Sequence, residues 1–189
     1  MTVYTPRHAA RVLLVDADGR VLLFAGFDPA RPDHRYWFTP GGGLDPGEAP
    51  AAGAARELAE ETGLRLTPAE LGEPVWRETI EYPFDGVWYR QEQEFFLVRV
   101  PSWEVDTAGF DDVEQASVTG HRWWSAAELT ASDEVYHPRD LVAILSRALA
   151  APGGRMGGTV PDKVSGPNAP AGRSRAADPA GDPAGGVPC

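Results

Sequence analysis

The chain has 189 residues and a formal net charge of −11, a length typical of one globular domain with room for a short appendage. Its one cysteine, Cys189, is the last residue, which excludes a disulfide framework within the chain and a zinc site built on cysteine. Residues 1–150 carry −12, because residues 151–189 hold four Lys/Arg and three Asp/Glu. This acidic balance argues against stable nucleic-acid binding, which depends on Lys and Arg.

The first expected elements are two short strands. Residues 11–15 (RVLLV) and 21–24 (VLLF) are apolar, and residues 16–19 (DADG) between them have turn composition. This pattern predicts a β-hairpin. The N-terminal residues contain no apolar stretch long enough for a signal peptide or a membrane span, so we expect a cytoplasmic protein with no membrane partner.

Residues 26–35 are polar and interrupted by two prolines, which predicts a loop. Arg35 in this loop could line a substrate mouth, although a solvated loop explains the same composition. Residues 36–39 (YWFT) predict a short aromatic strand. Its Trp37 either stacks on a nucleobase or belongs to the core.

An acidic helix follows a glycine run. Gly41-Gly42-Gly43 opens a loop, and helix-forming residues extend from about residue 50 to Gly63, a predicted left-handed C-cap. Glu57, Glu60 and Glu61 are spaced so that their carboxylates lie close together. Like charges at this spacing cost about 0.2–0.5 kcal/mol, a penalty that Mg²⁺ or Mn²⁺ would remove. For this motif alone, a solvated acidic helix end is the simpler interpretation.

The wider spacing changes that interpretation. Gly42, Glu48, Arg56-Glu57-Leu58, Glu60-Glu61 and Gly63-Leu64 match every defined position of the Nudix box, so the chain resembles the Nudix hydrolase family. The resemblance implies an α/β fold over residues 1–150, a Nudix-type α/β/α sandwich with a mixed curved sheet. It also implies metal ligands at Glu57, Glu60, Glu61 and the Gly42 carbonyl, and a buried supporting ion pair between Glu48 and Arg56.

Two further strands are expected downstream, at residues 75–82 and 87–100. Glu92 and Glu94 share a face with Phe96 and Val98, which is unexpected unless that face opens towards a cleft. Nudix enzymes often draw a further carboxylate from such a strand. The resemblance therefore favours Glu94 as a catalytic metal ligand, with Glu92 as the alternative and a solvent-facing strand end as the competing interpretation.

The remaining residues predict less chemistry. We expect residues 101–120, with Asp111, Asp112 and Glu114, to form an acidic irregular loop. Residues 121–124 predict a strand, and residues 140–150 predict an amphipathic helix. The four histidines are scattered, so we expect no histidine-based metal site. Residues 151–189 contain nine Gly and seven Pro with no aromatic residue, which predicts a disordered tail without a catalytic role.

The resemblance implies metal-dependent hydrolysis of the diphosphate linkage in a nucleoside diphosphate joined to another nucleotide, a sugar or a phosphate. A carboxylate takes the proton of the attacking water: Glu57, Glu60, Glu94 or a loop residue. The alternative is a non-catalytic Nudix-like nucleotide-binding or regulatory module, although such modules usually have eroded boxes. An isoprenoid diphosphate isomerase would need a catalytic cysteine, which the position of Cys189 disfavours.

The substrate stays open at this point. The proline of ADP-ribose hydrolases and the coenzyme A signature are not apparent at their usual places. Tyr82 lies where dinucleoside polyphosphate hydrolases tend to carry a tyrosine, which makes it a candidate substrate contact beside Arg35 and Trp37. The expected partner is a small-molecule nucleotide, and a homodimer remains an open alternative.

Overall fold

A computed structural model describes residues 2–150 of the chain. The predicted tail, residues 151–189, lies outside the described residues. The elements in chain order are β1 (Thr5–Val15), β2 (Val21–Asp28), β3 (Arg31–Phe38), β4 (Gly41–Gly43), α1 (Pro50–Thr62), α2 (Pro68–Leu71), β5 (Trp76–Phe84), β6 (Val87–Arg99), α3 (Asp112–Ser117), β7 (Val118–Trp124), α4 (Ala126–Ala131), β8 (Tyr136–His137) and α5 (Leu141–Ala150).

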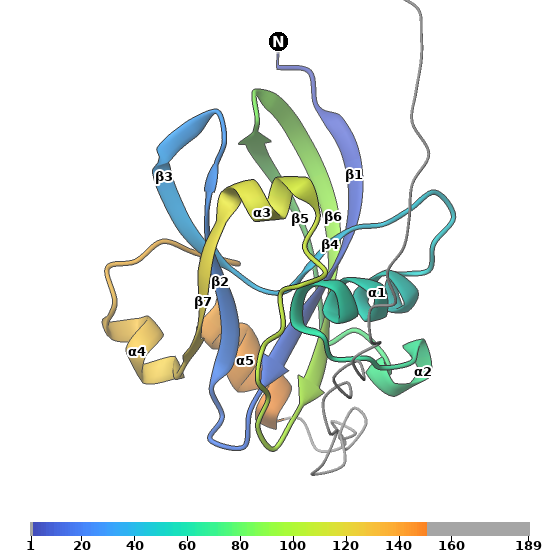
Figure 1. The fold of residues 1–189 in the computed structure, drawn as a ribbon, viewed down its shortest axis with the longest axis vertical. Coiled ribbons are helices and arrows are strands. Elements are labelled where there is room, and N and C mark those ends of the chain that lie inside the picture. The colour runs from blue at the N-terminus through green and yellow to red at the C-terminus, as the bar shows by residue number, and fades with distance from the viewer. Residues whose placement is uncertain (1, 151–189) are drawn as a thin grey trace, which may run out of the picture.

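The strands form one mixed sheet with the order β5-β6-β1-β2-β3-β8, to which β4 and β7 add by pairing with β1 and β2. β1 runs parallel to β6 along its whole length, whereas it pairs with β2 only at Val15↔Val21. The two halves of the sheet therefore separate above that point (Figure 1). The tips of the β2–β3 and β5–β6 hairpins, one from each half, are in contact. There the Asp85 amide, in the β5–β6 turn, donates to the Asp28 carboxylate at the end of β2 (2.9 Å).

Helices pack on both faces of this sheet. One core cluster joins Val12 and Phe96 of the sheet to Leu58 of α1. A second cluster, on the other face, joins Leu13 to Leu145 of α5. The alternation of side chains along β1 and β6 explains the two clusters, because neighbouring residues point to opposite faces. The predicted α/β/α sandwich with a mixed curved sheet is confirmed.

The acidic helix has the bounds that its sequence indicates. α1 begins with Pro50, whose missing N–H costs nothing at the first helical position, and ends at Gly63, which has a left-handed φ of 73°. The Thr62 hydroxyl donates to the Leu58 carbonyl (2.6 Å). Buried Leu58 packs the helix against the sheet. This packing also determines the positions of Glu57 and Glu61 on the same helix.

Two expectations about loops were wrong. Residues 26–35 form the end of β2, a tight turn and the start of β3, with Ala25↔Trp37 and Phe27↔Arg35 paired. The side chains of residues 31–35 are exposed, so a polar sequence is compatible with strand structure there. Within the acidic segment 101–120, residues 112–117 form helix α3, whose capping box joins Asp111 and Glu114.

Candidate active site

Three glutamates from two helices converge beside the sheet. Glu57 and Glu61 come from α1 and Glu114 comes from α3, and one carboxylate oxygen of each lies within 4.8 Å of the others. Glu57 is 8% exposed and Glu61 is 3% exposed. We call these three residues the acidic cluster. Three close carboxylates with no histidine or cysteine offer the hard oxygen donors that Mg²⁺ and Mn²⁺ prefer.

The protonation of the acidic cluster is shifted by its surroundings. Burial raises the pKa of Glu57, although the neighbouring Arg56 opposes this. Burial and the nearby Glu57 carboxylate raise the pKa of Glu61 well above its usual value. Burial is also the main cause of the raised pKa of Glu114. Each carboxylate is therefore costly to ionise in the free protein, and a bound cation would reverse that cost.

The glycine strand β4 closes tightly on this cluster. The Gly41 amide donates to the Glu61 carboxylate (2.5 Å). A Cβ atom at position 42 would lie only 2.7 Å from the Glu57 carboxylate. Glycine is therefore required at position 42 for the backbone to approach Glu57 this closely.

Arg56 links the glycine strand, the loop and the helix. Its guanidinium contacts both oxygens of Glu48 (Nε–Oε1 3.1 Å and Nη2–Oε2 2.9 Å), and it also donates to the Gly43 carbonyl (3.0 Å). It reaches Glu57 (2.8 Å) and Glu60 (3.1 Å) through Nη1. The hydrogen bond from Arg56 lowers the pKa of Glu48. This bidentate pair fixes the loop against α1.

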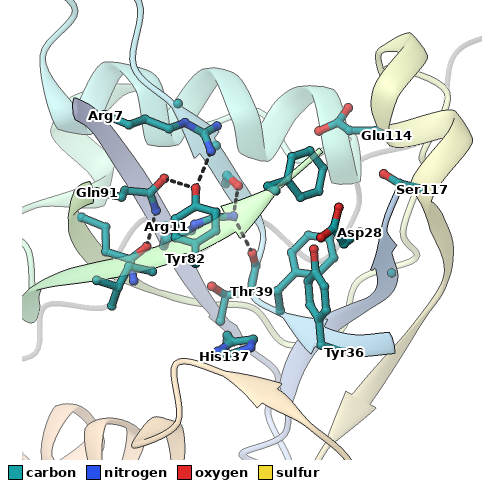
Figure 2. Close-up of a pocket in the computed structure, with 18 of the residues that line it drawn as sticks. Arg7, Arg11, Asp28, Tyr36, Thr39, Tyr82, Gln91, Glu114, Ser117 and His137 are labelled. Carbon is teal, nitrogen blue, oxygen red and sulfur yellow. Dashed lines mark hydrogen bonds between the residues drawn. The ribbon is translucent and has the colours of Figure 1, made fainter. Parts of the chain in front are cut away.

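A cavity of about 730 Å³ lies beside the acidic cluster and between the two halves of the sheet. Figure 2 shows Arg7 and Arg11 from β1, Tyr82 and Gln91 from the β5–β6 hairpin, and Tyr36 from β3 around it. Arg11 donates to the Gly41 carbonyl and to the Thr39 carbonyl (3.4 Å). Burial lowers the pKa of Arg11, and the nearby positive charge of Arg7 lowers it further.

The structure brings only some of the predicted residues to this cavity. Glu57, Glu61, Gly42 and Tyr82 line it. Glu60 is half-exposed and bound to Arg56. Glu94, Trp37 and Arg35 do not line the cavity.

Glu94 does not join the acidic cluster. It forms an ion pair with Arg77 of β5 (3.2 Å), and it lines a separate, smaller depression together with Glu92. The neighbouring residues Gln91 and Gln93, on the opposite face of β6, line the large cavity instead. The face of β6 that opens towards the acidic cluster is therefore not the face that carries Glu94.

Two candidate substrate contacts on β3 also point away from the cavity. Trp37 packs against the second core cluster, the one that contains Leu145 of α5. Its ring meets that of Trp124 edge to face, with ring centroids 5.1 Å apart. Its indole N–H donates to Glu134 (3.2 Å). Arg35 is exposed and does not line the cavity. The structure thus places Trp37 in the core, one of the two alternatives left open by the sequence.

Three residues of the site were not identified from the sequence. The local sequence places Glu114 in an irregular acidic loop and indicates no role for Arg7 or Arg11. The spacing Asp111-x-x-Glu114 is a helix N-terminal signature that could have predicted α3. Nothing local predicts that Glu114 of α3 reaches Glu57 and Glu61 of α1, because these residues are far apart in the chain.

None of the helices among residues 2–150 is long and apolar enough to cross a membrane.

Comparison with known proteins gives a consistent picture. Residues 5–144 match the model of the NUDIX domain. An RNA pyrophosphohydrolase of Cereibacter sphaeroides is 33% identical over 139 residues, which cover 67% of this chain and 80% of the relative. An RNA pyrophosphohydrolase of Roseobacter denitrificans is 32% identical over 162 residues, covering 75% of this chain and 95% of the relative.

Solved structures share the fold at lower sequence identity. A MutT protein from Methanosarcina mazei Go1 has a TM-score of 0.57 at 18% identity, covering 78% of this chain and 95% of that chain. A MutT NUDIX hydrolase from Burkholderia pseudomallei has a TM-score of 0.54 at 20% identity, covering 76% and 98%.

Proposed function

The chain belongs to the NUDIX domain family, and its relatives indicate that it is a pyrophosphohydrolase. From this premise we propose that it is a metal-dependent enzyme that hydrolyses a nucleoside diphosphate linked to another moiety. The observation that supports this most directly is the acidic cluster at the wall of a large cavity. A non-catalytic binding module would have no need for three close carboxylates that repel one another, two of them buried and the third half-buried.

The donor set fits a divalent cation. Glu57, Glu61 and Glu114 offer three carboxylate oxygens within 4.8 Å, and carboxylates without nitrogen or sulfur ligands suit Mg²⁺ or Mn²⁺. This ligand set differs from the one expected from the sequence, because we propose Glu114 in place of the strand residue Glu94. Glu57, Glu61 and Glu114 would hold the cation, which would supply a positive charge for phosphate oxygens and a lower pKa for an attacking water.

The chain's own residues supply the remaining roles. The Glu48–Arg56 pair holds β4 and α1 together, so that Gly42 stays close to Glu57. A carboxylate of the cluster accepts the proton of the attacking water. Arg11, held by two backbone carbonyls, places a positive charge in the cavity where a polyphosphate would lie.

A second candidate substrate is the 5′-triphosphate end of an RNA. It is favoured by the two relatives named RNA pyrophosphohydrolases, of which this chain covers 80% and 95%. The acidic net charge argues for recognition of the chain end alone, because extended backbone contacts need many Lys and Arg residues.

A substrate panel tests the proposal. Purified full-length protein would be incubated with ADP-ribose, a sugar nucleotide, ATP, a dinucleoside tetraphosphate and a short 5′-triphosphate RNA, with millimolar Mg²⁺ or Mn²⁺. We expect products of pyrophosphate-bond cleavage from at least one of them, abolished by EDTA and by Glu61→Gln. Activity that survives complete metal removal, or no hydrolysis of any member with either metal, would refute the proposal.

A further inference from the structure

Five side chains form a continuous hydrogen-bonded chain along the β1, β5 and β6 side of the cavity. Arg7 Nη1 donates to the Tyr82 hydroxyl (2.8 Å), Tyr82 donates to Gln91 Oε1 (2.7 Å), Gln91 Nε2 donates to Gln93 Oε1 (2.7 Å), and Gln93 Nε2 donates to Glu78 Oε1 (2.6 Å). The bonds among Arg7, Tyr82 and Gln91 are drawn in Figure 2.

The two ends give this chain a single direction. A guanidinium can only donate hydrogen bonds and a carboxylate can only accept them. The Tyr82 hydroxyl must therefore turn its lone pairs to Arg7 and its proton to Gln91. Gln91 is fully buried and Gln93 is 6% exposed, so neither amide can reverse without leaving a buried polar group unpaired. Glu78 thus fixes the orientation of every group up to Arg7.

Arg7 itself retains binding capacity. A guanidinium has five N–H groups, and within residues 2–150 Arg7 donates one to Tyr82 and forms no ion pair with a carboxylate. It lines the cavity together with Arg11. Neither Arg7 nor Arg11 forms an ion pair within the described part of the chain, so their charges repel each other across the cavity, and an anion between them would relieve that repulsion.

The glycine strand relates Arg7 to the acidic cluster. A Cβ atom at Gly43 would lie 3.0 Å from Arg7 Nη2, and one at Gly42 would lie 2.7 Å from the Glu57 carboxylate. Successive residues of a strand point to opposite faces. Arg7 therefore lies at the face of β4 to which Gly43 points, and Glu57 lies at the opposite face, to which Gly42 points. Both line the same cavity, and a polyphosphate crossing the edge of this thin strand would meet both.

We infer that Arg7 binds a phosphate group beyond the diphosphate at the acidic cluster, and that Glu78 is a positioning residue that orients Arg7 through Gln93, Gln91 and Tyr82. This inference rests on the proposed function and narrows it: the substrate carries three or more consecutive phosphates. A sugar nucleotide, with two phosphates, offers Arg7 no phosphate to bind.

The test measures anion binding and turnover separately. Binding of inorganic triphosphate is measured by calorimetry in EDTA, and KM and kcat are measured for ATP with Mg²⁺. We expect Arg7→Gln to weaken triphosphate binding and raise KM at least about tenfold, since it removes charge-assisted hydrogen bonds. Glu78→Gln and Tyr82→Phe should each raise KM about three- to tenfold, with kcat within about twofold.

The variants are chosen to separate position from charge. Tyr82→Phe breaks the hydrogen-bonded chain between Arg7 and Gln91 and removes no charge. If it raises KM as much as Glu78→Gln does, the orientation of Arg7, and not the charge of Glu78, is responsible. Arg77→Gln is the matched control, because it removes an arginine charge from β5, the strand of Glu78 and Tyr82, at the ion pair with Glu94 outside the cavity. It should change triphosphate binding less than about twofold.

The outcomes distinguish this inference from the proposed function. Metal-dependent hydrolysis by the wild type, with triphosphate binding and KM unchanged in Arg7→Gln, overturns the inference alone. An effect of Arg7→Gln without any effect of Glu78→Gln and Tyr82→Phe overturns the positioning role. Arg7-dependent triphosphate binding by a wild type that hydrolyses no nucleotide supports the anion site and refutes the hydrolase.

Discussion

Removing the charge of Glu61 should stabilise the metal-free protein. The carboxylate oxygens of Glu61, Glu57 and Glu114 lie within 4.8 Å of one another, and Coulomb's law with an effective dielectric constant of about 20 gives about 3.5 kcal/mol for two unit charges at that separation. Partial protonation and the nearby arginines offset part of this repulsion. We expect Glu61→Gln to raise the free energy of unfolding by about 1–2 kcal/mol at pH 8 in EDTA.

The pH dependence gives this prediction its sign. The folded-state pKa of Glu61 is raised above its usual value of 4.5, mainly by burial and then by Glu57. Between these two values the folded state binds more protons than the unfolded state, so the wild type loses stability as pH rises through that window. The advantage of Glu61→Gln should therefore be absent near pH 4, grow with pH and level off above the folded-state pKa.

Urea denaturation at several pH values, in EDTA and in millimolar Mg²⁺, measures this effect. Mg²⁺ should stabilise the wild type by binding only the folded state, and the variant should lose most of that stabilisation together with at least about 10²-fold in turnover. The exposed Glu104→Gln serves as the control. A variant that is less stable than the wild type at pH 8 in EDTA would show that the cluster is not under electrostatic strain.

Three further predictions follow from the placement of single side chains. Glu114→Gln should lower turnover at saturating Mg²⁺ by more than about tenfold and Glu94→Gln much less; the reverse ranking would return the strand residue to the metal site. Trp37→Ala should cost about 3 kcal/mol in urea denaturation, because the ring packs against Trp124 in the core, whereas a change confined to KM would mean that Trp37 contacts substrate. Burial lowers the pKa of His137 from 6.5 to about 4. Between these pH values the unfolded state binds more protons than the folded state. Acidification from above pH 6.5 should therefore destabilise the wild type, by at most about 3 kcal/mol. His137→Gln should lack this component when the melting temperatures at pH 7.5 and pH 5 are compared, and an imidazole signal of His137 that titrates near pH 6.5 would contradict the shift.

The sequence predicts the part of the site that is local and misses the part that depends on distant contacts. The glycines, Glu57 and Glu61 lie within one short segment, where helical spacing determines which side chains come together. Glu114 reaches them from more than fifty residues away, through a chain path that no local pattern describes. The same holds for Arg7 and Arg11, whose surroundings depend on β1 lying next to β6 and β4.

β6 shows why alternation alone was insufficient. Strand parity correctly separates Glu92 and Glu94 from Gln91 and Gln93. Both faces of this central strand are buried further along, at Phe95 and Phe96, so the apolar pattern could not indicate which face opens to the cavity. Glutamine was the informative residue type: two buried amides, each donating one side-chain hydrogen bond and accepting another, mark the cavity side, while Glu94 pairs with Arg77 on the other face of β6.

The contact between Asp85 and Asp28 makes the cavity the inside of a closed ring. β1 and β2 part above Val15 and Val21, and the hairpin tips rejoin through the Asp85 amide and the Asp28 carboxylate. A molecule that continues beyond the cavity at both ends would have to be threaded through this ring, or the ring would have to open. A molecule that ends inside it needs neither. We therefore expect the ring to admit the termini of polymers and to exclude their interior segments, whatever the chemistry of the group that is cleaved.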